Sequence, residues 1–207
     1  MSIICAFGDS ITWGAFDTEK GGWVERLKAY LLESDNDVYN LGVSGDKTPH
    51  ILERFEIETK TRVEEGEDVI LVFAVGINDS YFIQSKKDFM TPPENFKRNI
   101  QEIIERAQKI SSKIIFVGLT PVDELKTSPI PWDTDKFFKN ENIEKYNEII
   151  RSACRENKVH FIEIFNNWIK SDYRDMLEDG LHPNSEGHKK IFETVKDYLI
   201  QNKLTKI

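Results

Sequence analysis

A serine, an aspartate and a histidine occupy positions from which they could together perform nucleophilic catalysis. Ser10 follows an apolar run, Ile3–Phe7, and Asp179 stands three residues before His182. A serine hydroxyl attacks a carbonyl carbon when a base takes its proton, and an imidazole is oriented for this by an acceptor on its other nitrogen. Gly180 permits a tight turn that brings Asp179 back to the same ring. The chain order serine, aspartate, histidine therefore predicts a catalytic triad.

Acyl transfer also needs hydrogen-bond donors for the oxyanion that develops in the transition state. The backbone N–H of Ser10 could be one donor. The N–H of Gly45 could be a second, because glycine allows close backbone approach and a positive φ. The side-chain amide of Asn78 could be a third. Asp9 is not needed as a base, and we expect it to play a supporting part by accepting backbone N–H groups from a neighbouring loop and fixing the turn.

Each of these residues also has a purely structural interpretation. Asp9 or Ser10 could cap a helix, which is common for both residue types. The acid–base pair near the C-terminus could form a polar turn before a helix that starts near Pro183. Gly45 could be an ordinary turn glycine, and Asn78 a loop cap. The catalytic interpretation is favoured because it gives every one of these residues a role at a single place.

The elements that must position these residues alternate between strand and helix. Five apolar segments are predicted as strands: Ile3–Phe7, Val38–Leu41, Val69–Val75, Lys113–Gly118 and Val159–Ile162. The third is a continuous apolar run, which is typical of a strand buried on both faces of a parallel sheet. The alternation predicts a three-layer α/β/α domain with a five-stranded parallel sheet. Ligands bind outside the carboxyl ends of such strands, and the polar clusters follow those ends.

Apolar residues recur with the helical period in four segments: Trp23–Leu31, Phe96–Ala107, Ile143–Ala153 and Ile191–Leu199. A weaker pattern covers Thr48–Glu65, with Pro49 in its first turn and Asp46 as the expected cap. Two long stretches, Asp79–Pro93 and Pro121–Asn140, are predicted to be irregular and to be candidate binding loops. Five aromatic residues could line a pocket there: Trp13, Tyr81, Phe82, Trp132 and Phe137.

Four short segments carry a resemblance to a known family. They read GDSIT at 8–12, GVSGD at 42–46, GIND at 76–79 and DGLHP at 179–183. In this order and spacing they resemble the four sequence blocks of the SGNH hydrolases, also called the GDSL esterase/lipase family. Isoleucine replaces the leucine of the family name, which is a conservative apolar change. The α/β-hydrolase elbow G-x-S-x-G is absent.

The resemblance implies a flavodoxin-like sheet and a serine esterase. It places the nucleophile on Ser10 and the acid and base on Asp179 and His182. It places the oxyanion glycine on Gly45 and the oxyanion asparagine on Asn78. Members of this family hydrolyse acetylated sugars, lysophospholipids, thioesters and small alkyl or aryl esters, so the resemblance does not select one substrate.

Composition excludes several other classes of protein. The 207 residues carry a net charge of −8 and no basic stripe, so we expect no nucleic-acid partner. No long apolar segment predicts membrane insertion, and the short N-terminal apolar run lacks the features of a signal peptide, which favours a cytoplasmic location. Cys5 and Cys154 are expected to be free buried thiols. We expect residues 1–207 to form a single SGNH-hydrolase-like domain whose oligomeric state the sequence leaves open.

Two other function classes remain open at this point. A metal-dependent hydrolase or phosphatase could hold Mg²⁺ or Mn²⁺ with five residues: Asp9, Asp46, Asp79, Asp179 and His182. That alternative leaves the serine, the glycine and the asparagine without roles. A non-catalytic flavodoxin-like module would not need these residues together. We therefore expect a serine esterase acting on small acyl esters without a metal or cofactor, with a lysophospholipase or acyl thioesterase as the alternative.

Overall fold

The five predicted apolar segments form the strands of one parallel sheet. The computed structural model describes residues 2–34, 36–64 and 66–205. The strand order is β2-β1-β3-β6-β8. The strands are β1 (Ser2–Gly8), β2 (Asn36–Gly42), β3 (Asp68–Ala74), β6 (Lys113–Val117) and β8 (His160–Ile162). The predicted flavodoxin-like α/β/α fold is confirmed.

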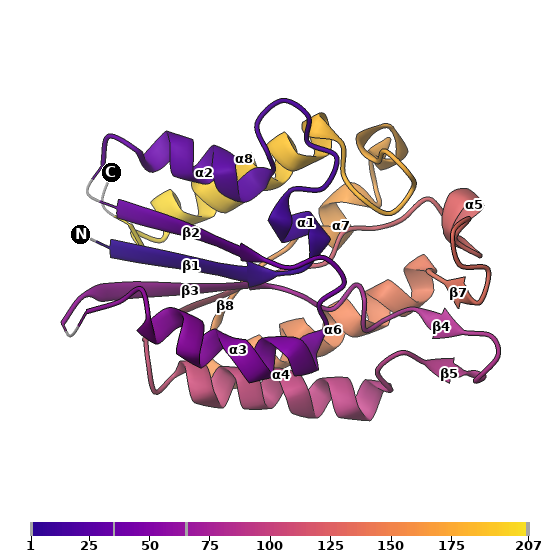
Figure 1. Cartoon of the computed structure of the whole chain (residues 1–207), viewed down its shortest axis with the longest axis horizontal. Helices are drawn as coiled ribbons and strands as arrows, with labels where there is room; N and C mark the ends of the chain where they lie inside the picture. The colour runs from indigo at the N-terminus through magenta and orange to yellow at the C-terminus, as the bar shows by residue number, and fades with distance from the viewer. Residues whose placement is uncertain (1, 35, 65, 206–207) are drawn as a thin grey trace.

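Helices cover both faces of the sheet. On one face lie α2 (Trp23–Leu31) and α8 (Ser185–Gln201), and on the other α3 (Thr48–Lys60), α4 (Pro93–Ala107) and α6 (Asn140–Asn157) (Figure 1). Strand β1 is buried along its whole length, and its side chains alternate between two apolar clusters. Cys5 and Phe7 belong to the cluster under α3, α4 and α6, and Ile4 and Ala6 to the other. Burial on both faces explains why the central strands are apolar throughout.

The start of α3 corrects one prediction. Pro49 does lie in the first turn, but Asp46 does not cap the helix. The carboxylate of Asp79 accepts hydrogen bonds from the backbone N–H and the hydroxyl of Thr48 instead. Asp46 pairs with Arg54, which comes from the second turn of the same helix. A residue 31 positions away in sequence thus replaces the local cap, because the loop after β3 folds against the start of α3.

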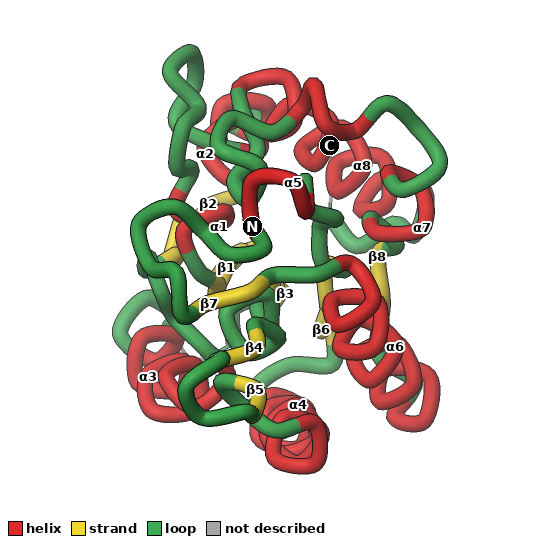
Figure 2. Tube along the Cα trace, turned by 90° about the vertical axis from the view of Figure 1, so that its right-hand side faces the viewer, coloured by secondary structure: helices red, strands yellow, loops and turns green. Residues whose placement is uncertain are grey.

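The two stretches predicted to be irregular contain a small second sheet. Its strands are β4 (Phe82–Ile83), β5 (Asp88–Phe89) and β7 (Lys136–Phe137), in the order β5-β4-β7 with antiparallel pairing. It lies in front of the carboxyl ends of the main strands, together with the short α5 (Glu124–Thr127) (Figure 2). Both candidate binding loops therefore do reach the edge of the sheet where the site residues were expected.

The remaining elements are short. They are α1 (Ser10–Trp13), α7 (Phe165–Trp168) and a 3₁₀ turn, η1 (Tyr173–Met176). Cys5 and Cys154 are free and buried, as expected. Within the described ranges, no helix combines the length and apolar character needed to cross a bilayer.

Candidate active site

The turn after β1 places Ser10 directly above the edge of the sheet. Asp9 caps α1 by accepting the N–H of Ile11 at 2.9 Å, which is the structural role that the sequence also allowed. This contact lies within its own turn and not, as expected, with a neighbouring loop. Gly8 is required for this close approach. A Cβ at Gly8 would lie 2.1 Å from Thr12 Oγ1 and 2.4 Å from the carbonyl oxygen of Ala74. Any side chain at this position would therefore push α1 away from the sheet.

The candidate nucleophile, base and acid form one hydrogen-bonded chain. Ser10 Oγ lies 2.9 Å from His182 Nε2, and His182 Nδ1 lies 2.7 Å from Asp179 Oδ2. The other oxygen of Asp179 accepts the backbone N–H groups of Leu181 and His182, while Gly180 turns the chain at φ +92°. The aspartate is thus fixed by its own loop and points the imidazole toward the serine. This geometry suits general-base activation of a hydroxyl.

The environment of Asp179 keeps its carboxyl group ionised. Partial burial acts to raise its pKa, but the hydrogen bonds from the His182 ring and from two backbone N–H groups outweigh burial, and the pKa lies below its ordinary value. A charged carboxylate next to Nδ1 stabilises an imidazolium when His182 takes up a proton.

Three donors surround the space beside Ser10 Oγ. No acceptor among the described residues takes the backbone N–H of Ser10 or of Gly45. Gly45 has φ +84°, and a Cβ built on it would meet no atom within 4 Å, so its backbone borders open space. Asn78 Nδ2 donates one proton to the carbonyl oxygen of Asp46 at 3.1 Å, which leaves its second proton for a ligand. The arrangement suits an oxyanion hole.

Arg54 connects this donor set to the sheet, and sequence reasoning missed it. Its guanidinium bonds the carboxylate of Asp46 at 2.8 Å and the carbonyl oxygen of Leu41 at 2.7 Å. It also reaches the carbonyl oxygen of Gly8 at 3.4 Å. Arg54 therefore ties the ends of β1 and β2 to the loop whose carbonyl holds Asn78. In the sequence, the signal that could have indicated this role is an arginine within the weak apolar stripe of α3.

A cavity of about 590 Å³ opens over these residues. Besides the candidate triad and the two candidate oxyanion residues, its walls include Phe16, Tyr81, Ile130, Trp132 and Phe138. Tyr81 and Trp132 line the cavity as expected. Trp13, Phe82 and Phe137 do not, and Phe138 takes the place of its neighbour.

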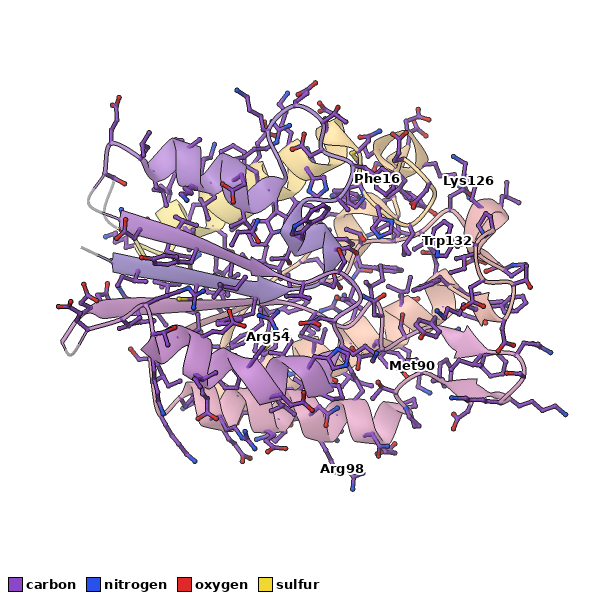
Figure 3. All side chains as sticks on the ribbon, in the orientation of Figure 1. Phe16, Arg54, Met90, Arg98, Lys126 and Trp132 are labelled. Atoms are coloured by element: carbon purple, nitrogen blue, oxygen red, sulfur yellow. The ribbon has the colours of Figure 1, made fainter. Side chains whose placement is uncertain are left out.

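Phe16 is a wall residue that the sequence did not indicate. It has φ +64°, which is rare for a bulky residue, and its ring centroid lies 5.3 Å from that of His182. Phe16 and Trp132 both lie at the carboxyl-end side of the sheet (Figure 3). The two aromatic side chains are about half exposed, at 49% and 58%. They therefore offer apolar surface to a bound molecule.

Two acidic residues of the alternative metal site are buried and used elsewhere. Asp9 is 2% exposed, and burial raises its pKa to about 7 against the hydrogen bond from Ile11 and the field of His182. Asp79 is fully buried, and burial raises its pKa to about 6 despite its hydrogen bonds with Thr48 and Thr91. In the described part of the chain, no three His, Cys, Asp or Glu side chains gather so as to hold a metal ion. Metal independence itself remains a prediction.

The sequence as a whole fits a known family model. The model of the GDSL-like lipase/acylhydrolase family matches residues 6–190. The chain belongs to this family. The match begins in β1 and ends in α8, so it includes all four segments that carry the resemblance. As a GDSL-like acylhydrolase, the protein is a carboxylic ester hydrolase by class.

Solved structures share the fold of this GDSL-like protein. A lipase/acylhydrolase from Enterococcus faecalis has a TM-score of 0.76 at 21% identity, over 96% of this chain and 95% of the other. A G-D-S-L family lipolytic protein from Veillonella parvula has a TM-score of 0.74 at 20% identity, and the match covers 95% of this chain and 97% of the other. An acetylxylan esterase from Geobacillus stearothermophilus has a TM-score of 0.71 at 18% identity, and the match covers 95% of this chain and 92% of the other. No curated protein sequence is detectably similar to the chain.

Replacing Asn78 with alanine is expected to lower kcat on the order of 10²–10³-fold while KM changes little. In the expected role, the lost amide proton binds the oxyanion, which develops on the way to the tetrahedral intermediate and is absent from the bound substrate. Steady-state kinetics on 4-nitrophenyl acetate measures both constants. Asn95→Ala on α4, away from the cavity, is the matched control and should behave like the wild type. A raised KM with an unchanged kcat would mean that Asn78 binds the substrate instead.

Proposed function

We propose that the protein is a serine esterase that hydrolyses short-chain carboxylic esters through an acyl-enzyme on Ser10. One observation carries this proposal: the hydrogen-bonded chain from Asp179 through His182 to Ser10 ends at an open cavity beside three donors. Membership in a family of acylhydrolases supports the reaction class.

The first half of the reaction transfers the acyl group to the protein. Ser10 Oγ forms a bond to the ester carbonyl carbon as its proton passes to His182 Nε2. The carbonyl oxygen becomes an oxyanion that the N–H groups of Ser10 and Gly45 and the amide of Asn78 bind. When the carbonyl re-forms, the bond to the alkoxy oxygen breaks, and the proton on Nε2 moves to that oxygen. The alcohol then leaves the site.

The second half releases the acid. A water molecule in the place of the alcohol gives a proton to His182 Nε2 while its oxygen attacks the acyl carbon. The bond between Ser10 Oγ and that carbon breaks, Oγ recovers the proton, and the carboxylic acid departs. Asp179 holds the ring and stabilises the imidazolium in both halves. The protein is unchanged at the end of the cycle.

The loop between α5 and β7 supports a short acyl group. Ile130 and Trp132 of this loop, with Phe138 just after β7, bring apolar surface over the cavity. Asp133 and Lys136 interrupt this surface with charges, so it offers no extended apolar face for a lipid chain. Among the proteins of similar fold, several are named acetyl xylan esterases, and acetyl is a short acyl group.

A panel of 4-nitrophenyl esters tests the proposed function. We expect kcat/KM to be highest for acetyl or butyryl and to fall toward octanoyl and palmitoyl. Trp132→Ala should change the ratio between chain lengths, because Trp132 lines the cavity. Trp13→Ala is the matched control, since Trp13 is also 58% exposed but does not line the cavity. An optimum at palmitoyl would contradict the short-chain claim, and an unchanged ratio in Trp132→Ala would remove the loop from substrate selection.

A further inference from the structure

The charges around the cavity differ in sign from those of the chain as a whole. The protein carries a net charge of −8, yet two lysines, Lys47 and Lys136, line the cavity over Ser10. The carboxylate that shares this wall, Asp179, is already bonded to His182. The cavity therefore presents positive charge within a protein whose overall field repels anions.

Lys47 has no direct carboxylate partner among the described residues, although its charge acts to lower the pKa of the buried Asp79. It lies two residues after Gly45, at the start of α3, and is half-buried. Among the described residues, no carboxylate oxygen lies within 4.0 Å of its Nζ. The carboxylate of the adjacent Asp46 forms an ion pair with the Arg54 guanidinium at 2.8 Å, and its other oxygen lies 3.3 Å from His50 Nδ1. A lysine in this position keeps three N–H donors for a ligand.

Lys136 is held in place by its neighbours. Its Nζ pairs with Asp133 at 2.9 Å and lies 5.3 Å from the centre of the Tyr81 ring. These contacts fix the ammonium group at the cavity wall but leave it partly neutralised. Lys47 is thus the cation with the greater capacity to bind an anion, and Lys136 adds to the local field.

The position of Lys47 indicates which part of an ester it would meet. The alkoxy group must leave next to His182 Nε2, because that nitrogen protonates it. His182 precedes α8, whereas Lys47 starts α3, and these helices cover opposite faces of the sheet (Figure 1). Phe16, which contacts the His182 ring, lines the alkoxy side. The acyl group therefore extends away from His182, into the part of the cavity that Lys47 lines together with the loop between α5 and β7.

We propose that the preferred substrates are esters whose short acyl group ends in a carboxylate, and that Lys47 binds this carboxylate. The chemical class is the monoesters of short dicarboxylic acids. A lysophospholipid also carries a negative charge, but on the alcohol side, away from Lys47. The proposal rests on the proposed function, since it assumes acyl transfer to Ser10.

The test compares esters that differ only in this charge. Monoethyl glutarate is paired with ethyl glutaramate, in which a carboxamide of similar shape replaces the carboxylate. Acetoxyacetate and acetoxyacetamide form a second pair, with the charge on the alcohol side. Hydrolysis of all four is followed by acid release in a pH-stat. Lys47→Met, Lys47→Arg and, as the control, Lys109→Met are measured beside the wild type. Lys109 is an exposed lysine after α4 at the amino-end edge of the sheet, away from the cavity.

We expect the wild type to prefer monoethyl glutarate over its amide by about tenfold in kcat/KM, as for a hydrogen bond to a charged group. Lys47→Met should abolish the preference, Lys47→Arg should keep most of it, and Lys109→Met should leave it unchanged. Equal rates within the first pair, or a preference that survives Lys47→Met, would overturn the proposal. A charge preference confined to the acetoxyacetate pair would overturn it as well.

Hydrolysis of 4-nitrophenyl acetate by the wild type but not by Ser10→Ala tests the proposed esterase function separately from the proposed preference for a carboxylate on the acyl group. If that difference is present and the glutarate preference is absent, the substrate proposal fails and the proposed function stands. If the wild type releases no 4-nitrophenol, both fail together.

Discussion

Ser10→Ala should lower kcat on 4-nitrophenyl acetate by about 10³-fold or more. Alanine removes the hydroxyl oxygen that is proposed to form the acyl-enzyme. Asp9 still caps α1 and the backbone of residue 10 keeps its place, because the cap bond runs from the Ile11 N–H to the Asp9 side chain. The loss therefore falls on the chemical step. Burst kinetics should also disappear, and no acyl adduct should form on the peptide that contains residue 10.

Ser152→Ala is the control for this change. Ser152 lies on α6, where its hydroxyl bonds Glu148, and it does not line the cavity. Its kcat should match that of the wild type. Turnover in Ser10→Ala close to the wild-type value, with the melting temperature preserved, would remove the serine from the mechanism.

His182→Ala should cause a loss of similar size, and combining it with Ser10→Ala should add little. The two side chains share one hydrogen bond and perform one step, so removing either already disables that step. Asp179→Ala should cost less than either, because it orients the base without touching the substrate. Double-variant kinetics on 4-nitrophenyl acetate measures the non-additivity. His160→Ala, in β8 and bonded to Tyr198, is the control.

The pH dependence of kcat/KM distinguishes the role of His182, the proposed base, from that of Asp179. The imidazole must be neutral to accept the serine proton, so kcat/KM should rise with pH on the acid side. The pKa of Asp179 lies below its ordinary value, so this carboxyl group stays ionised over the same range and does not produce the rise. A kcat/KM that stays flat from about pH 5 to 8 would contradict the role of His182 as the base.

The main sheet could be predicted because buried parallel strands leave a continuous apolar signal. The run Val69–Val75 corresponds to β3 with a shift of one residue at each end. The small sheet left no such signal, since β4, β5 and β7 have two residues each and no alternation can develop over that length. Its pairing depends on how two distant loops meet over the edge of the main sheet.

The parts of the candidate site that could be predicted are those whose geometry depends on residues close together in the sequence. The spacing of Asp179 and His182 indicated their contact, and the structure brings Ser10 to the same ring. The surroundings were not predictable in this way. Asp79 replaced Asp46 as the cap of α3 because of a contact between distant segments. Phe16 reaches His182 through a backbone conformation that its residue type does not indicate.

The buried carboxyl group of Asp9 has a consequence for the stability of the folded protein. Its pKa of about 7, and that of Asp79 near 6, lie above the value of about 4 that an unfolded chain gives. Between these limits the folded protein binds protons that the unfolded chain has released, so the free energy of unfolding falls as pH rises. Carboxyl groups with lowered pKa, such as Asp179, act in the opposite sense only near and below pH 4. The buried His188, whose pKa burial lowers from 6.5, acts against this trend at lower pH. Raising the pH through neutrality is therefore expected to weaken the fold over the same range in which kcat/KM is expected to rise.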